Sequence, residues 1–399
     1  MNNTIKLAVA SALLAAASTA SAAGGIVAGD WTIDIGGNVN EFAIYNTSKD
    51  SNVVAGGLAN TRQAKGNKAS VSLNTGLLPS WLGFTGKTRQ NDLDVEFAIS
   101  MQPGGSTTSS LAGGGGTENR QAYISFGDKS WGTILIGKNL GEFGRDAILL
   151  DQTLLGVGSQ GVVGTAGGTT TTLGRIGTGY LYADFQGQIN YTTPNMNGFQ
   201  ATAGIVQPIN TANASTSSLA STGSQTAPAY EAKGSYSFAG DVAGKVWAEV
   251  KTQKVDYTAT IGNTATAFGV GANVNAAGFG LVAYYYDAKG VGTTAWLKDG
   301  VSSTGAKRDS NGGYVQGSYT LPGVGTKLAA SWGISKLDLA AGEAASTLVK
   351  ENEMITVGAY HPLTKHLNLV AEYSNVQAKS HLNAQNESDI VSAGAILFF

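Results

Sequence analysis

The 399-residue sequence contains no cysteine, only three histidines and few charged residues, which make up 13% of the chain. Without cysteine, neither a disulfide framework nor thiol redox chemistry is available. Charged residues normally account for about 25% of a globular protein, so charge is depleted by about half. The 27 acidic and 25 basic residues nearly balance, which leaves no basic footprint for nucleic acid. The histidines lack metal-ligand spacing and no nucleophile–base arrangement is recognisable, so we expect neither an enzyme nor a cofactor.

Long apolar runs are also missing beyond the first residues. The opening stretch MNNTIKLAVASALLAAASTASA combines Lys6, a short apolar segment and the small-residue site Ala20-Ser21-Ala22. This pattern is typical of a secretory signal peptide, so we expect residues 1–22 to be removed and residues 23–399 to form one exported domain. No later segment approaches the roughly 18 apolar residues that a membrane helix requires. If the exported chain spans a membrane, it must do so as a closed β-barrel.

Apolar and polar residues alternate along the exported chain. In DLDVEFAISM (residues 92–101), Leu93, Val95 and Phe97 share one face of a strand, and Glu96 lies on the other. The segments LNLVAEYS (367–374) and KLAASWGIS (327–335) alternate in the same way. A period of two over such lengths indicates strands with one apolar face.

The connections between these segments alternate between short turns and long polar loops. Short turns include GDKS (127–130) and PGVG (322–325), and long loops include QPINTANASTSSLASTGSQTAP (207–228). Bacterial outer-membrane barrels have short turns at one end and long loops at the other. We count sixteen strands joined by seven short turns and eight long loops. The last segment, DIVSAGAILFF, is then expected to pair with WTIDIGGNVNEFAIY and close the barrel.

Several segments resemble the general trimeric porins of Gram-negative outer membranes. These are GLLPS (76–80), NRQAYISFGDKSWGTILIGKNLGEFGRDAILLD (119–151), INYTTPNMNGFQATAGIV (189–206), ITVGAYHPLTKHLNLVAEYS (355–374) and the final Phe399. In the fourth segment Thr364 and His366 replace the usual serine and arginine. The resemblance implies an all-β fold, a 16-stranded antiparallel transmembrane β-barrel whose third loop folds inward. It also implies a homotrimer in the outer membrane, surrounded by lipid, with Phe399 read by the barrel-assembly machinery.

The same resemblance implies a charged constriction that small hydrophilic solutes and ions cross by passive diffusion. Charges of opposite sign facing each other in a narrow aqueous pore select solutes by size, dipole and charge. The implied acidic residues of the third loop are Glu142, Asp146 and Asp151. The implied basic residues are Arg120 and Arg175 on the wall, with Lys138 and Arg145 as further candidates. Alternation places Glu96, Lys327 and Glu372 on the lumen face, and Lys68 is a further candidate there.

Two features depart from the family pattern. An extra segment, IGTGYLYADFQG (176–187), follows Arg175, so the height of this residue in the barrel is open. Trp81 stands where many relatives have another wall arginine. We therefore expect either fewer basic residues at the constriction than usual, or a basic side formed by Lys68, Lys138 or Arg145 instead. Trp247, Trp332 and the tyrosines of AYYYD (283–287) are candidates for membrane-interface belts or a subunit contact.

Three alternatives remain open at this point. A substrate-specific channel, for a sugar or an anion, would show saturable block by one solute. A surface adhesin or structural barrel would show no conductance and would bind through its long loops. A soluble secreted β-protein would dissolve without detergent.

Overall fold

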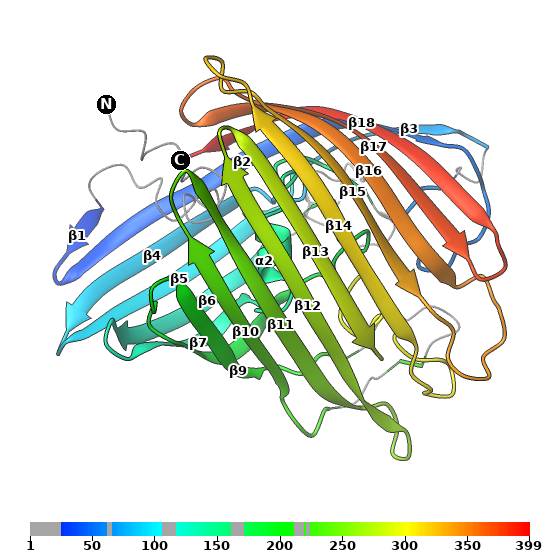
Figure 1. Cartoon of the computed structure of the whole chain (residues 1–399), viewed down its shortest axis with the longest axis horizontal. Coiled ribbons are helices and arrows are strands. Elements are labelled where there is room, and N and C mark those ends of the chain that lie inside the picture. The colour runs from blue at the N-terminus through cyan, green and yellow to red at the C-terminus, as the bar shows by residue number, and fades with distance from the viewer. Residues whose placement is uncertain (1–24, 62–65, 106–116, 161–170, 211–218, 221–223) are drawn as a thin grey trace.

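The computed structural model describes residues 25–61, 66–105, 117–160, 171–210, 219–220 and 224–399. The expected signal peptide, residues 1–22, lies outside these ranges. The described chain forms one closed antiparallel sheet, shown in Figure 1. Its strands are β1 (Ile26–Ala28), β2 (Trp31–Ser48), β3 (Ala69–Asn74), β4 (Trp81–Gln90), β5 (Leu93–Pro103), β6 (Thr117–Asp128), β7 (Gly132–Leu140), β8 (Phe185–Thr192), β9 (Phe199–Val206), β10 (Ala229–Phe238), β11 (Val242–Asp256), β12 (Gly262–Ala276), β13 (Phe279–Lys289), β14 (Asp309–Thr320), β15 (Lys327–Leu337), β16 (Val349–Pro362), β17 (Leu367–Ser380) and β18 (Gln385–Phe398).

These strands make a 16-stranded barrel wall, as the sequence predicts. The short β1 folds back as a hairpin on the start of β2 and adds no wall position. Both β3 and β4 pair with β2, β3 with residues 42–47 and β4 with residues 32–38, so together they form one interrupted wall strand. Between them, residues 75–80 leave the wall. Leu77 is 5% exposed and its N–H donates to the carbonyl of Gly156 at 2.9 Å.

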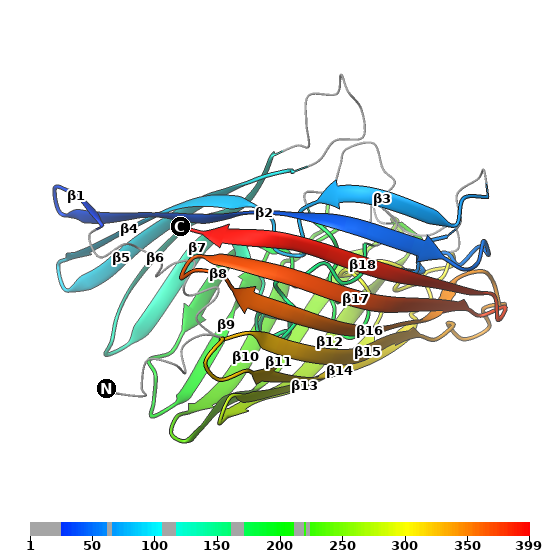
Figure 2. The ribbon, with the colours of Figure 1, turned by 90° about the horizontal axis from the view of Figure 1, so that it is seen from above.

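The barrel closes where the last strand meets the first long one, and this prediction is confirmed. β18 pairs with β2 from Ser388↔Ser48 to Phe398↔Asn38. The pairing continues through Phe399, whose N–H and carbonyl both bond to the backbone of Gly37 at 3.1 and 3.0 Å. Figure 2 shows β18 lying beside β2. Each strand therefore has a neighbour on both sides at this seam, and no sheet edge is left there.

Short and long connections fall at opposite ends of the barrel. One end, here called the turn end, carries seven connections of two to six residues, at 91–92, 129–131, 193–198, 239–241, 277–278, 321–326 and 363–366. The other, the loop end, carries eight connections, at 49–68, 104–116, 141–184, 207–228, 257–261, 290–308, 338–348 and 381–384. Two of these eight, 257–261 and 381–384, are as short as the turns. The expectation of eight long loops is corrected to six, because β11–β12 and β17–β18 continue their pairing nearly to the tip.

The two faces of the wall differ as the alternation predicts. On β13 the side chains of Tyr284 and Tyr286 are 4% and 0% exposed and point inward, whereas Tyr285 between them is 49% exposed and points outward. Among the described residues, no helix is long and apolar enough to cross a bilayer. The outward apolar face and inward polar face are those of a barrel that spans a membrane with its strands.

Aromatic pairs gather on the outer face near the turn end. Ring centroids lie 4.4 Å apart in Phe199–Tyr236 and in Phe279–Tyr319. Outer-membrane barrels carry such aromatic girdles at the level of the lipid headgroups. Trp332 is 41% exposed on the outer face, but Trp247 is 2% exposed. The expectation that Trp247 belongs to an outer belt or contact is therefore wrong: it shares the inward parity of Lys245 and Glu249 and stacks on Tyr284.

Candidate functional site

The third loop connects β7 to β8; its described residues, 141–160 and 171–184, lie inside the barrel and include the short helix α2 (Arg145–Leu149). Its first residues bind the inner wall through their backbone. The N–H groups of Glu142 and Phe143 donate to Glu231 Oε2, and the N–H of Gly144 donates to Glu249 Oε1 at 2.8 Å. Because these N–H groups precede or begin α2, they have no intrahelical acceptor. Wall carboxylates on β10 and β11 thus determine where the loop enters the lumen.

A buried ion cluster then fixes the helix to the wall. Lys233 Nζ lies 2.7 Å from Glu142 Oε2 and 3.1 Å from Asp146 Oδ2, and Lys245 Nζ lies 2.6 Å from Asp146 Oδ1. Arg145 contacts Glu142 Oε1 at 2.8 Å. Side-chain exposure is 9% or less for Glu142, Asp146 and Lys233. Such a cluster persists only if every charge has a partner.

The pKa values of the two loop carboxyls reflect this balance. Burial alone raises the pKa of Glu142, but the charges of Arg145 and Lys233 outweigh it and hold the pKa below its ordinary value. Burial likewise raises the pKa of Asp146, and Lys233 and Lys245 bring it below its ordinary value. Both groups are therefore carboxylates at neutral pH.

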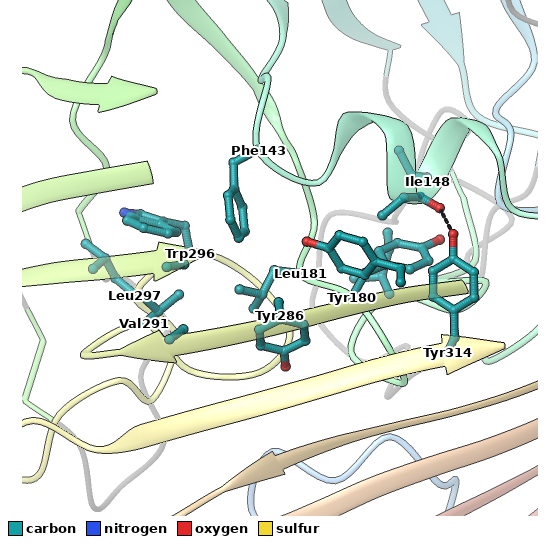
Figure 3. Packing of buried hydrophobic residues seen from close by; sticks show 14 of the residues in the cluster. Phe143, Ile148, Tyr180, Leu181, Tyr286, Val291, Trp296, Leu297 and Tyr314 are labelled. Atoms are coloured by element: carbon teal, nitrogen blue, oxygen red, sulfur yellow. Dashed lines mark hydrogen bonds between the residues drawn. The ribbon is translucent and has the colours of Figure 1, made fainter. Parts of the chain in front are cut away.

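The middle of the loop is held by side chains of β14 and β15. Asp151 Oδ1 accepts hydrogen bonds from Thr153 and, at 2.6 Å, from Gln316. Tyr314 donates to the carbonyl of Ala147 at 2.6 Å, the bond drawn in Figure 3. Lys327 donates from Nζ to the carbonyl of Gln152 at 2.7 Å. The loop therefore follows the wall from β10 as far as β15.

The far part of the loop is anchored to β16 and β17. Glu372 Oε2 accepts the N–H groups of Val157 and Gly158 at 2.7 and 3.1 Å, and Tyr360 donates to its other oxygen. Arg175 is completely buried and donates from Nη1 to the carbonyls of Thr178 and Met354. Arg175 thus lies in the third loop and not on a wall strand.

Apolar packing fills the space behind the loop. Figure 3 shows Phe143, Ile148, Tyr180 and Leu181 of the loop meeting Tyr286 and Tyr314 of the wall and Trp296 and Leu297 of the 290–308 loop. The rings of Tyr180 and Tyr314 lie 5.7 Å apart, edge to face. The lumen beside β11–β14 is consequently occupied by protein.

The opposite side of the loop borders a cavity of about 580 Å³, here called the pore cavity. Its wall comes from β2, β4, β5, β6, the end of β7 and the start of β8. Its other side is the third loop with residues 77–79 and 294–295. The charged residues that line it are Asp34, Lys87, Glu96, Glu118, Arg120 and Asp184. The third loop contributes Ile148, Leu149, Leu154, Thr171, Thr172, Leu173, Ile176, Tyr182 and Asp184. Apart from Asp184 at the very end of the loop, the described loop residues that line the cavity are therefore uncharged.

A β-bulge brings Arg120 into the lumen. Ser100 pairs with Gln121 and Met101 with Asn119, so Arg120 is an extra residue on β6. Strict alternation would place neighbouring residues on opposite faces, but Arg120 and Gln121 both line the pore cavity. A bulge re-aims a side chain in this way.

Both cations of the cavity are paired with carboxylates of the same wall. Arg120 Nε lies 2.9 Å from Glu118 Oε2, and the guanidinium lies 5.4 Å from the centre of the Phe185 ring. Lys87 Nζ lies 3.6 Å from Glu96 Oε2. Basic and acidic side chains therefore lie next to each other along the wall of the cavity, and Asp34 and Asp184 add negative charge.

The predicted site residues are thus separated into two groups. Arg120 and Glu96 line the pore cavity, whereas Glu142, Asp146, Asp151, Lys327 and Glu372 lie between the third loop and the wall. Arg145 binds Glu142 and the carbonyls at the start of the loop. Lys138 continues the outward face of β7, two residues from Ile136, and Lys68 is exposed at the loop end. None of Lys68, Lys138, Arg145 and Arg175 lines the pore cavity.

Sequence reasoning missed the wall partners Glu231, Lys233, Lys245 and Glu249. The signal was present in GKVWAEVK (244–251), where Lys245, Glu249 and Lys251 share one parity and valines occupy the other. Charged residues on one face of a strand indicate the lumen. This face was therefore a candidate contact for the charged third loop. Among the described residues, no group of histidine, aspartate and glutamate is arranged to hold a metal ion.

Comparison with known proteins assigns the class. The model of the Gram-negative porin family matches residues 8–381. No curated protein sequence matches the chain. The structure is similar to the outer-membrane channel DcaP of Acinetobacter baumannii, with a TM-score of 0.69 and 17% identity over 94% of this chain and all of that one. An anion-selective porin from Comamonas acidovorans gives a TM-score of 0.64 and 15% identity over 92% of this chain and all of that one.

A third similar structure is the trimer form of OmpT from Vibrio cholerae, with a TM-score of 0.53 and 14% identity over 92% of this chain and 99% of that one. At these identities the structures show a shared fold. The family match covers most of the sequence, and the observed sixteen-stranded barrel agrees with it. The chain belongs to the Gram-negative porin family and is a diffusion channel of the outer membrane.

Proposed function

We propose that ions and small hydrophilic solutes cross the barrel through the pore cavity, between the third loop and the wall of β2 and β4–β6. The observation that carries this proposal is the division of the lumen: protein fills it beside β11–β14, and the cavity of about 580 Å³ remains beside β4–β6. Six charged side chains line that cavity. Charged groups at a narrow aqueous passage keep it hydrated and filter solutes by charge.

Within this pathway the residues have two roles. Arg120, Glu96, Glu118 and Lys87 form the charged wall of the constriction, where solutes meet them directly. Glu142, Asp146 and Asp151 act as anchors that hold the third loop against the wall, since each is bonded there. The transverse field then arises mainly from the wall residues and from Asp184.

We further propose a homotrimer in a lipid bilayer, with loops outside the cell and turns in the periplasm. OmpT of Vibrio cholerae, which shares the fold, has a trimer form. The outer face supports contact with lipid or a second subunit, because Val39, Val71 and Leu73 of β2 and β3 are 58–72% exposed. Crosslinking of the detergent-extracted protein tests the subunit number, and a monomer at all concentrations would exclude the trimer.

Single-channel recording in planar bilayers tests the pathway. We expect stepwise ohmic conductance that Arg120→Ala changes in ion selectivity, while Lys254→Ala at an exposed loop-end position leaves selectivity unchanged. Saturable block by one sugar or anion would instead support a substrate-specific channel. Absence of conductance, with binding by the loops, would support an adhesin.

A further inference from the structure

The pore cavity has two chemically different sides. One side is the uncharged surface of the third loop, where Leu149 and Leu173 are partly exposed and Ile176 lies beneath them. The other side is the strand wall, which carries the ion pairs Lys87–Glu96 and Arg120–Glu118. A solute in the cavity therefore meets apolar side chains and charges at the same time. Only a solute that is itself amphipathic gains from both.

Two aromatic residues of the strand wall, Trp81 and Phe185, add apolar surface to the cavity opposite the third loop. A Cβ placed on Gly83 would lie 2.2 Å from Cζ3 of Trp81, so the indole covers the Gly83 backbone. Trp81 also lines the cavity, so solutes in the cavity lie next to this residue. Phe185, at the start of β8, already carries the guanidinium of Arg120 over its ring at 5.4 Å. Aromatic faces attract cations through the ring quadrupole, and tryptophan does so most strongly.

Among the described residues, the charged side chains that line the cavity carry a net negative charge. Four carboxylates, Asp34, Glu96, Glu118 and Asp184, face two cations, Lys87 and Arg120, and each cation contacts a carboxylate. The third loop between residues 152 and 174 contains no charged residue at all in the sequence, so it does not offset this excess. An organic cation is therefore favoured over an organic anion in this cavity.

Apart from Asp184, the hydrogen-bonding side chains on the loop side, such as that of Tyr182, are neutral. Burial raises the pKa of Tyr182 to about 12, although the charge of Arg120 lowers it in part. Its hydroxyl is therefore a neutral group at physiological pH. The cavity volume of about 580 Å³ falls in the range of small-molecule sites, about 300–1,000 Å³.

We infer that the pore cavity binds and passes amphipathic organic cations, solutes with one aromatic or apolar ring and a protonated amine, in preference to ring-bearing anions and to small ringless cations. The ring lies between Trp81 and the Leu149–Leu173 surface, and the ammonium faces the carboxylates. This inference rests on the proposed pathway, since it assumes that solutes traverse this cavity.

Current block in single channels tests it with three probes. Benzylammonium has a ring and a positive charge, benzoate has the same ring and a negative charge, and ethylammonium has the charge without the ring. We expect benzylammonium to reach half block at about tenfold lower concentration than either of the other two, from ring burial and the cation–π contact together.

Substitutions distinguish the contribution of the solute's ring from that of its charge. Leu149→Ser and Trp81→Ala should each reduce the advantage of benzylammonium over ethylammonium, whereas Leu363→Ser, at the exposed turn 363–366, should not. Asp184→Asn should reduce the advantage of benzylammonium over benzoate, and Asp241→Asn in the turn 239–241 should leave it unchanged. Leu149 is partly exposed on α2, so its substitution spares the barrel wall.

The outcomes distinguish this inference from the proposed function. Ohmic conductance with equal block by benzylammonium and ethylammonium, or with stronger block by benzoate, overturns the inference and leaves the channel intact. Absence of conductance in the wild-type protein overturns both. Ring-dependent block that persists in both Trp81→Ala and Leu149→Ser places the binding site elsewhere and overturns the inference.

Discussion

The two sides of the third loop differ in chemistry: one side faces the wall of β10–β17, and the other faces the pore cavity beside β4–β6. Beside β10–β17 the third loop is charged and paired, with Glu142 and Asp146 bound to Lys233 and Lys245. Beside β4–β6 it presents Leu149, which is apolar and partly exposed. The charges of the loop therefore position it, while the charges that a solute meets belong mainly to the wall.

This difference has a physical reason. A buried carboxylate without a partner costs several kcal/mol, so charged loop residues stay only where the wall supplies partners. The side of the loop that borders the pore cavity has no such requirement, because water or a solute fills that cavity. The buried pairs near Glu142 and Asp146 fix the start of the loop against the wall. The comparison predicts that substitutions on the two sides have different consequences.

The largest effect is expected for Lys233→Ala. Removing this lysine leaves Glu142 and Asp146 buried with less compensation, which costs about 3–5 kcal/mol for a broken buried pair. We expect a lower denaturant midpoint together with a noisier open-channel current as the loop leaves the wall. Lys254→Ala is the matched control, since Lys254 is 58% exposed and 3.6 Å from Asp256. Equal effects of the two substitutions would contradict the anchoring role.

A smaller loss of folding stability is expected for Glu372→Ala, whose side chain anchors the far part of the loop. The N–H groups of Val157 and Gly158 then lose their acceptor inside the barrel, at a cost of about 1–3 kcal/mol. Denaturant unfolding and current noise measure this cost. Glu372→Gln retains an acceptor oxygen and should recover most of the stability. If Glu372→Gln were as damaging as Glu372→Ala, charge and not hydrogen bonding would be the cause.

Acidic pH should weaken the ion pairs that hold the third loop against the wall. In the unfolded chain aspartate and glutamate titrate at about 3.9 and 4.3, and the folded pKa values of Glu142 and Asp146 are lower. Their stabilisation is therefore complete above about pH 4.3 and is lost as the pH falls through the folded values. Current noise recorded from pH 7 to pH 3 should rise at the acidic end. Asp146→Asn should flatten this rise, and an unchanged profile would exclude these groups.

The smallest change is expected for a substitution in the strand wall of the pore cavity, where it alters the conductance. Gly83→Ala would place its Cβ 2.2 Å from the Trp81 ring, so the indole must move into the pore cavity. We expect a modestly lower single-channel conductance with unchanged noise. Gly234→Ala is the control, because no atom lies within 4 Å of the corresponding Cβ position. A conductance equal to that of the control would mean that Trp81 does not border the narrow part of the pathway.

The barrel could be predicted because its signals are local and repeated. Alternation in residues 92–101, short turns such as 322–325 and the apolar segment 389–399 each indicate strands, turns and closure without knowledge of the rest. The wrong prediction that Trp247 belongs to an outer belt or contact has a specific cause. An aromatic residue fits both an outer belt and a lumen filled by a loop, and parity relative to Lys245 and Glu249 was the only discriminating signal.

The candidate site could be predicted less well because it depends on contacts between distant segments. The sequence indicated that the third loop carries Glu142, Asp146 and Asp151, but not on which side of the loop they point. That choice depends on Lys233, Lys245 and Gln316, which follow about 90 to 165 residues later. The bulge at Arg120 is similarly invisible to alternation, since it breaks the period of two at a single residue.

The seam between β18 and β2 has a consequence for how the molecule forms. Nearly every other strand pair joins segments adjacent in the chain, which can assemble early at low entropic cost, whereas Ile396 must find Asn40 across most of the polypeptide. The cylinder is thus a chain of hairpins completed by one long-range step. Loss of the final strand would leave every hairpin before β17–β18 intact in sequence and yet expose two edges, so ring closure is all-or-none.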